Sequence, residues 1–278
     1  MLRTRIATAA LAIPLLVWLI AWNPWSLFIW LVGGATLIGV FEYCAMAFPR
    51  DPADRVFGIA AGMLVLSAML VPSGERFEIA VAGVVVGGLI VTLAREQDLR
   101  RGVEALGLSL LGTLYVAFLL PHYVWMHRLP DPMAAGAAAS APGGWRWVIL
   151  TLVIAMAGDV GGYFGGRTFG RHKLMPSVSP GKTVEGTVGA GLANIAGGVF
   201  CKLVFFQALT WGEVVGLSLA TGCLAQVGDL CESMLKRAFG AKDSGWIIPG
   251  HGGVLDRIDS LVFPAPLVYY YATFLFTA

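Results

Sequence analysis

The chain has 278 residues, of which 57% are hydrophobic and only 13% are charged, and its net charge is +2. Soluble domains usually carry about 25% charged residues, and no polar stretch here is long enough to form one. A nearly neutral chain gives no reason to expect a nucleic-acid partner. The composition therefore predicts one integral membrane domain over residues 1–278.

Apolar segments long enough to cross a bilayer, about 20 residues each, recur along the chain. Arg3 and Arg5 precede the first of them as in a signal peptide, but no small-residue cleavage site follows, so we expect a retained helix. The prediction is an all-α, polytopic membrane helical bundle of about nine transmembrane helices. The expected spans are 5–22, 25–47, 56–72, 77–94, 102–127, 146–166, 184–206, 213–235 and 261–277.

Basic residues are divided unevenly between the two sides of this bundle. With a cytoplasmic N-terminus, 15 of the 19 Lys and Arg residues lie on the cytoplasmic side, as the positive-inside rule expects. The other side keeps Arg76, Arg128, Arg146 and Lys202. Residues 1–150 are mostly membrane scaffold, whereas the polar motifs gather in residues 158–259, on the predicted cytoplasmic face.

The densest polar motif is Ser233–Asp259, which reads SMLKRAFGAKDSGWIIPGHGGVLDRID. Its acidic and basic residues alternate, and glycines flank His251. A solvated loop anchored by its basic residues at the lipid headgroups is the simpler interpretation. Such an anchor, however, requires neither the glycines nor the histidine.

Carboxylates in and beside this motif point to a divalent cation. Asp229 lies inside an apolar span, where an ionisable side chain is costly and is a functional candidate; an internal ion pair with Lys236 is the alternative. Asp256 and Asp259 share a face if a helix begins there. Carboxylates suit Mg²⁺, and the interleaved basic side chains suit phosphate oxygens.

A second motif, SVSPGKTVEG, spans residues 177–186. Gly181-Lys182-Thr183 resembles the end of a P-loop, but Pro176 stands where the leading glycine belongs. What remains is a short loop with a lysine and hydroxyls that opens a helix, and a helix N-terminus binds phosphate well. A helix cap with a snorkelling lysine is the alternative.

A third motif, GDVGGYFGGRTFG, spans residues 158–170 and repeats glycine every four residues. This spacing predicts a helix face for close packing in a membrane. Asp159 in this motif is a candidate for a further metal ligand. Glu42, near the end of the second span, is expected to be structural.

The segment Ser233–Asp259 resembles the signature of the phosphatidate cytidylyltransferases. The positions that fit are Ser233, Lys236, Arg237, Lys242, Asp243, Gly245, Ile248, Pro249, His251, Gly252, Gly253, Asp256, Arg257 and Asp259. The SPGKT element is similar to a second family motif, with Gly181 where lysine is frequent, and residues 159–170 look like a further one. The first 150 residues match in character alone.

This resemblance implies a metal-dependent transfer of a cytidylyl group from CTP to phosphatidate, giving CDP-diacylglycerol and pyrophosphate. It implies a homodimeric, multi-pass protein of the inner (plasma) membrane, whose active site faces the cytoplasm. It also implies that Asp229 and Asp256 hold Mg²⁺, with a potassium ion beside it as a further expectation.

Roles for the remaining residues follow from this reaction. The expected catalytic residues are Asp229, Lys236, Arg237, Asp256, Arg257 and Asp259. The expected substrate-binding residues are Ser179, Lys182, Thr183, Lys242 and His251. The sequence does not divide the basic residues between CTP and the lipid.

Two other functions compete with this interpretation. A CTP-dependent polyprenol or lipid kinase would use similar groups but release CDP instead of pyrophosphate. An anion transporter would place charges near the bilayer midplane and often contain inverted repeats. Here the charges cluster on one face, and the sequence contains no repeat. The full Ser233–Asp259 signature favours the cytidylyltransferase.

Overall fold

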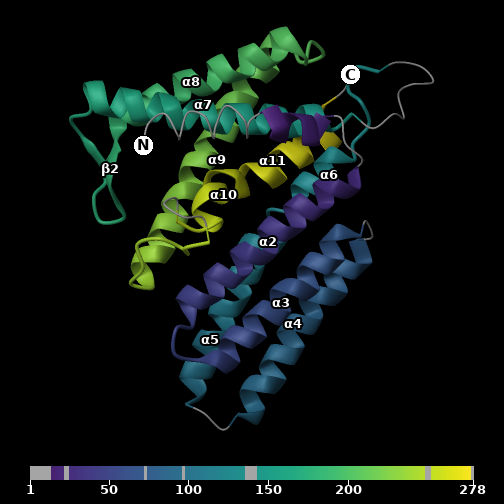
Figure 1. The fold of residues 1–278 in the computed structure, drawn as a ribbon, viewed down its shortest axis with the longest axis vertical. Coiled ribbons are helices and arrows are strands. Elements are labelled where there is room, and N and C mark those ends of the chain that lie inside the picture. The colour runs from purple at the N-terminus through teal and green to yellow at the C-terminus, as the bar shows by residue number, and fades with distance from the viewer. Residues whose placement is uncertain are drawn as a thin grey trace.

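The computed structural model describes residues 14–21, 25–71, 74–95, 98–134, 143–247 and 252–276. This part of the chain is mostly helical (Figure 1). Seven of its helical segments are long and apolar enough to cross a membrane: Ser26–Ala47, Pro52–Leu70, Glu75–Ala94, Leu99–His127, Trp145–Phe169, Val184–Val204 and Trp211–Ala238. They correspond to seven of the nine predicted spans, so the protein is a polytopic helical membrane protein. Helices satisfy every backbone hydrogen bond internally, which lipid surroundings demand.

The elements follow one another in simple order. The long helices are α2 (Trp25–Ala47), α3 (Pro52–Leu70), α4 (Gly74–Ala94), α5 (Leu99–Gly112), α7 (Trp145–Phe169), α8 (Val184–Val204) and α9 (Trp211–Ala238). Helix α5 continues through the π-helix η1 (Thr113–Phe118) to α6 (His122–His127). In Figure 1, α7 and α8 lie side by side across the top, α9 runs below them, and α2–α5 form the lower part.

The first and last predicted spans differ from expectation. Of the span 5–22, the described residues 14–21 are helical, and the rest lies outside the described residues. The span 261–277 is not one helix and begins six residues earlier, as α10 (Leu255–Val262), α11 (Pro264–Tyr270) and the π-helix η3 (Tyr271–Leu275). Pro264 lacks a backbone donor, which explains the break between α10 and α11.

The described residues also contain one two-stranded sheet, which the sequence did not predict. Strand β1 (Lys173–Met175) pairs antiparallel with β2 (Ser179–Thr183), with Lys173 opposite Thr183 and Met175 opposite Ser179. The SPGKT element is therefore a strand that leads directly into α8, not the predicted loop.

The packing of α7 on α8 confirms the glycine face predicted from sequence. A Cβ atom on Gly161 would lie 2.6 Å from the carbonyl oxygen of Gly189, and one on Gly186 would lie 2.9 Å from that of Gly162. Only glycine allows the two backbones to approach this closely. The two helices therefore form a fixed pair beside α9.

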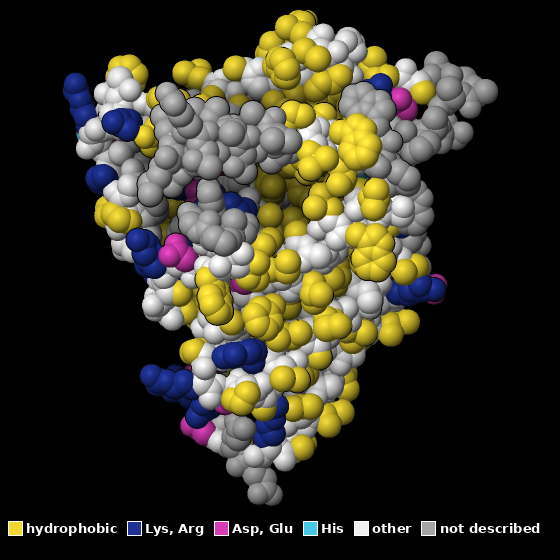
Figure 2. Space-filling view, viewed as in Figure 1, with side chains coloured by type: hydrophobic (Ala, Val, Ile, Leu, Met, Phe, Trp, Pro, Cys, Tyr) yellow, Lys and Arg dark blue, Asp and Glu magenta, His cyan; other side chains and the backbone are white. Residues whose placement is uncertain are grey.

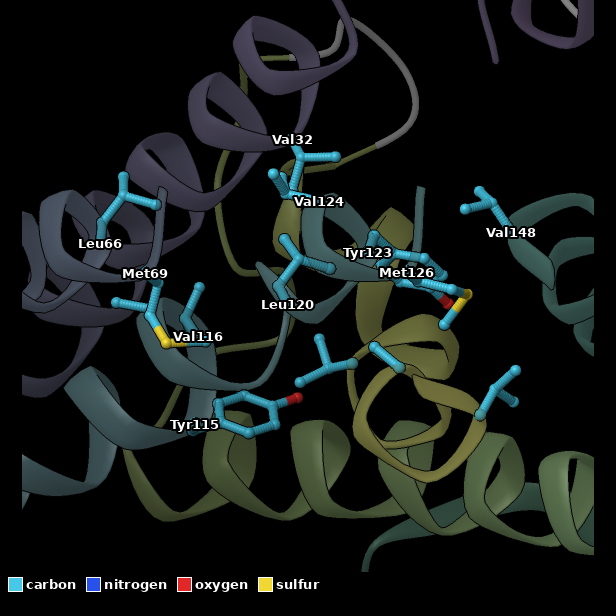
Figure 3. Packing of buried hydrophobic residues seen from close by; sticks show 14 of the residues in the cluster. Val32, Leu66, Met69, Tyr115, Val116, Leu120, Tyr123, Val124, Met126 and Val148 are labelled. Carbon is cyan, nitrogen blue, oxygen red and sulfur yellow. The ribbon is translucent and has the colours of Figure 1, made fainter. Parts of the chain in front are cut away.

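The apolar core is continuous through the rest of the bundle. Buried side chains from α2, α3, η1, α6 and α7 meet near its centre (Figure 3). Among them Val116 and Met126 are fully buried, and Tyr123 is 4% exposed. This core fixes how α2 is placed relative to α10 and α11.

Because successive spans reverse direction, the α2–α3, α4–α5, α7–α8 and α9–α10 connections lie at one end of the bundle, the basic end. This end carries 13 of the 17 Lys and Arg residues in the described part of the chain. Figure 2 shows them along the left and lower edges of the molecule. The charge asymmetry expected from the sequence is thus present in the fold.

Candidate functional site

A cavity of about 640 Å³ opens between α7, α8, α9 and β2, and we call it the α7–α9 cavity. Its wall includes Asp159 from α7, Ser179, Lys182 and Thr183 from β2, and Asp229 from α9. The two shorter polar motifs therefore meet Asp229 at one place, although 46 to 70 residues separate these side chains from it in the sequence.

The lysine of β2 reaches across this cavity to α9. Lys182 Nζ lies 2.8 Å from Asp229 Oδ2 and 3.5 Å from the carbonyl oxygen of Gln226. The Thr183 hydroxyl accepts a hydrogen bond of 3.1 Å from the Gly186 nitrogen, so it caps α8. The cap interpretation holds for Thr183, while Lys182 forms an ion pair instead of snorkelling.

A second ionic cluster joins α9 to α10. Lys236 Nζ forms ion pairs with Glu232 and with Asp256, the latter at 2.6 Å from Oδ1. The alternative of an Asp229–Lys236 ion pair is wrong, because each of these residues has a different partner. Gly228 permits this arrangement: a Cβ there would lie 2.6 Å from the carbonyl oxygen of Asp259, so α9 and α10 touch.

Asp256 also organises the signature loop, residues 239–254, of which 248–251 lie outside the described residues. Asp256 Oδ2 accepts hydrogen bonds from the Ser244 nitrogen (2.9 Å), the Ser244 hydroxyl (2.9 Å) and the Gly253 nitrogen (2.8 Å). Burial raises the pKa of Asp256, but the bonds from Lys236, Gly253 and Ser244 outweigh it and lower the pKa to about 2. The carboxylate therefore stays charged, with both oxygens engaged.

Glu42 of α2 fixes the same loop from the other side. Its carboxylate accepts hydrogen bonds from the Val254 nitrogen (3.0 Å) and the Leu255 nitrogen (2.8 Å). The Ser244 hydroxyl, whose one proton is shared between the two carboxylates, lies 3.2 Å from Glu42 Oε2 and 2.9 Å from Asp256 Oδ2. Cβ atoms on Gly245 and Gly253 would lie 2.4 Å and 2.5 Å from the Glu42 oxygens. The glycines of the signature thus make room for a buried carboxylate.

Where the structure describes them, the residues that the resemblance singled out lie on α7, β2, α9, the signature loop and α10. The comparison with known proteins extends over the whole chain. The profile of the Cytidylyltransferase family matches residues 3–275. The chain belongs to the cytidylyltransferase family. It is 33% identical over 271 residues to the phosphatidate cytidylyltransferase of Brucella suis biovar 1 (strain 1330), covering 96% of this chain and 92% of that one.

Two further relatives carry the same printed name. The phosphatidate cytidylyltransferase of Synechocystis sp. (strain ATCC 27184 / PCC 6803 / Kazusa) is 33% identical over 295 residues, covering 98% of this chain and 96% of that one. That of Staphylococcus aureus (strain COL) is 40% identical over 134 residues, or 45% and 48% of the two chains. Membership makes this protein an enzyme of CTP-dependent, lipid-related transfer.

The donor chemistry of this cytidylyltransferase suits Mg²⁺, because the carboxylates offer hard oxygen ligands. Asp229 has one oxygen beside Lys182 and the other 3.5 Å from the Ser233 hydroxyl. The backbone carbonyl of Asp259 lies against Gly228 of α9, so α10 holds this third carboxylate beside the helix that carries Asp229. Asp256, by contrast, must exchange a present partner before it can ligate a metal.

No preformed metal cage exists within the described ranges: they contain no group of three His, Cys, Asp or Glu side chains arranged as ligands. Asp229 and Asp256, the two expected ligands, are instead held by two different lysines. The site therefore holds the expected carboxylates, each neutralised by a cation of the chain.

Three expected basic residues remain accessible. Arg237, Lys242 and Arg257 are all exposed at the basic end. Arg237 donates to the carbonyl oxygen of Ala241 at 3.2 Å. His251, the last expected substrate-binding residue, lies outside the described residues.

The structure adds two residues that sequence reasoning missed. Asn194 of α8 lines the α7–α9 cavity, is 4% exposed, and has no hydrogen-bond partner for Oδ1 among the described residues. It could have been found by the rule that singled out Asp229, since a polar amide within a span is costly. Ser244, 5% exposed, bridges Glu42 and Asp256, and no local pattern marked it.

Proposed function

We propose that this cytidylyltransferase transfers the cytidylyl group of CTP to phosphatidate and yields CDP-diacylglycerol and pyrophosphate. The observation that carries the proposal is the convergence of the signature residues Lys236, Ser244 and Asp256 in one network. The printed names of the relatives that align with the whole chain support the same substrate.

The proposed reaction needs no nucleophilic side chain. A phosphate oxygen of phosphatidate is already anionic and attacks the α-phosphorus of CTP, while the bond to the bridging oxygen of the β-phosphate breaks and pyrophosphate leaves. The obstacle is repulsion between two polyanions, so positioning and electrostatic stabilisation supply most of the rate.

The chain's own cations address this repulsion. Lys182 projects into the α7–α9 cavity, and we assign it to the triphosphate. Lys236 is held between Glu232 and Asp256, which leaves it charged and oriented at the junction of α9 and α10. Arg237 and Lys242, exposed at the same end, extend the cationic surface toward the incoming nucleotide.

We propose Mg²⁺ as the cofactor, held by Asp229 and Asp256 with Asp259 as a helper, and a potassium ion beside it. When bound, Mg²⁺ would neutralise phosphate oxygens of the nucleotide. We also propose that the site faces the cytoplasm, where CTP is dissolved, while phosphatidate arrives from the bilayer. A homodimer in the inner membrane completes the proposal.

The test uses purified protein in detergent with phosphatidate, Mg²⁺ and CTP labelled in the α-phosphate and in cytosine. We expect both labels in the lipid phase and pyrophosphate in the water phase, with loss of product in EDTA and in Asp256→Asn. No labelled lipid from folded protein would overturn phosphatidate as the substrate. Release of CDP with a polyprenol acceptor would identify a kinase, and solute uptake by proteoliposomes without product would identify a transporter.

A further inference from the structure

A second hollow lies on another side of α10, and we call it the α10 groove. It has a volume of about 280 Å³ and is bordered by residues 14–21, α2, α6, α7 and α10. Figure 2 shows a hollow with a hydrophobic floor at this place, between α2 and α10 of Figure 1, with charged side chains at its left rim. Its volume is near the lower limit of about 300 Å³ for small-molecule pockets, which suits part of a lipid.

The lining of the α10 groove is apolar. Phe28 and Val32 of α2 and Leu152 of α7 form much of it. The Tyr123 hydroxyl donates to the carbonyl oxygen of Leu261 at 3.1 Å, so it presents no free polar group. Arg257 is the one charged side chain among the described residues that line the groove.

Helix α10 separates the groove from the carboxylates. Successive helical residues turn by about 100°, so Arg257, Ile258 and Leu261 fall within one arc of about 100° around α10. Asp256 and Asp259 fall on the other side of the helix. Arg257, Ile258 and Leu261 line the groove. Asp256 instead binds Lys236 of α9, and Asp259 packs its backbone on Gly228 of α9.

Helix α2 packs directly against α10 beside the groove. A Cβ on Gly39 would lie 3.7 Å from Ile258 Cδ1, in ordinary contact. The groove therefore starts beside Ile258 and extends along α2 toward Val32 and Phe28, away from the basic end. A chain bound in it would run in the direction of a lipid tail.

The cation at the mouth of the groove is available. Arg257 is exposed, and its side chain has no hydrogen bond or ion pair with another described residue. Lys182 and Lys236 are both paired with carboxylates. A free guanidinium binds phosphate oxygens strongly, and an apolar groove beside it adds affinity for a hydrocarbon chain. An anionic lipid satisfies both features.

We propose that the α10 groove binds an acyl chain of phosphatidate and that Arg257 binds its phosphate. This inference rests on the proposed function and assigns the two substrates to different places. Phosphatidate enters between α2 and α10, and CTP occupies the α7–α9 cavity with Lys182. The two reactants then meet at the N-terminal end of α10, where Asp256 and Lys236 lie.

The first test fills the deep part of the groove with Val32→Phe. Activity is measured in mixed micelles with dioctanoyl and dioleoyl phosphatidate at saturating CTP. We expect the KM for the dioleoyl lipid to rise roughly fivefold or more, and that for the dioctanoyl lipid to change much less, because the shorter chain does not reach Val32. The matched control is Leu37→Phe, on the same helix at a position 40% exposed and outside the groove, which should affect neither lipid.

The second test is Arg257→Gln, with Arg257→Lys as the conservative variant. The KM for both lipids should rise about tenfold or more in the glutamine variant, with the KM for CTP unchanged and partial recovery in the lysine variant. If Arg257 had a purely structural role, the glutamine variant would change the KM for CTP as well as the KM for the lipids.

A phosphatidate that carries a diazirine in its acyl chain supplies an independent readout on the wild-type protein. Crosslinks are expected on peptides of α2 and α10. Crosslinks confined to the α7–α9 cavity would overturn the proposal that the groove binds the acyl chain. Equal KM values for dioleoyl phosphatidate in Val32→Phe and Leu37→Phe would overturn it too. In both cases, conversion of phosphatidate by the wild-type protein would still support the proposed function. Failure of wild-type protein to convert phosphatidate would overturn both proposals.

Discussion

The carboxylate of Glu42 accepts a hydrogen bond of 2.8 Å from the backbone nitrogen of Leu255, 213 residues further along the chain. Glu42 is 2% exposed, and it also accepts from the Val254 nitrogen and from the Ser244 hydroxyl. The helix that the sequence marks as plain scaffold therefore holds the signature loop at two places, Ser244 and Val254.

Replacing Glu42 should weaken the fold and the activity together. Glu42→Ala leaves the N–H groups of Val254 and Leu255 buried without partners, at a cost of about 1–3 kcal/mol in the free energy of unfolding. Thermal unfolding in detergent and transferase activity measure the two effects. Glu104→Ala, which removes an exposed ion pair with Arg100, is the control and should change neither. Equal behaviour of the two variants would refute the anchoring role.

The three-helix junction around Asn194 gives a second prediction. A Cβ on Gly222 would lie 1.7 Å from Asn194 Nδ2, whereas one on Gly216 of the same helix meets nothing within 4 Å. Gly222→Ala should therefore destabilise the protein by about 1–3 kcal/mol through overpacking. Gly216→Ala should leave the stability equal or slightly higher, because alanine favours helix. Indistinguishable melting temperatures would contradict the close contact.

Lys182 and Lys173 lie on paired strands but face different surroundings. Lys182→Met should lower kcat/KM for CTP by about 10- to 100-fold, since a charge-assisted contact contributes about 1.5–3 kcal/mol. Lys173, which donates to the carbonyl oxygen of Pro180, lies outside the α7–α9 cavity. Lys173→Met should therefore retain the wild-type value, and steady-state kinetics at saturating lipid compare the two. A loss shared by both variants would argue against a specific role for Lys182.

The charge on Asp256 leads to a prediction about pH. Its pKa of about 2 lies below the value of about 3.9 in an unfolded chain, so its charge contributes stability above pH 4 that disappears as the pH falls toward 2. The decrease in melting temperature that Asp256→Asn causes relative to wild type should therefore be the same at pH 6 and pH 8. If the difference in melting temperature between wild type and Asp256→Asn changed between pH 6 and pH 8, the carboxyl group would be titrating in this range. The exposed neighbour Asp243→Asn is the control for a general charge effect.

Much of the architecture was predictable because it depends on local patterns. Hydropathy alone located seven spans, since each helix in lipid must satisfy its own backbone. The glycine spacing of residues 158–170 predicted the face that α7 presents to α8. The strand at Ser179–Thr183 was missed, because its pairing with Lys173–Met175 carries no strand-like alternation. The division of the last span followed from Pro264, whose effect the sequence analysis left out.

The sequence by itself singled out the candidate site residues, and only the tertiary structure decided how they are paired. Asp229, Lys236 and Asp256 were all identified from their types and spacing. Helical periodicity suggested Asp229 with Lys236, but Lys182 from β2 is the partner of Asp229. An ion pair forms wherever packing brings opposite charges within about 4 Å, and that distance depends on contacts such as Gly228 with Asp259, which connect helices far apart in the chain. The same reason explains Glu42, whose role depends on partners more than 200 residues away.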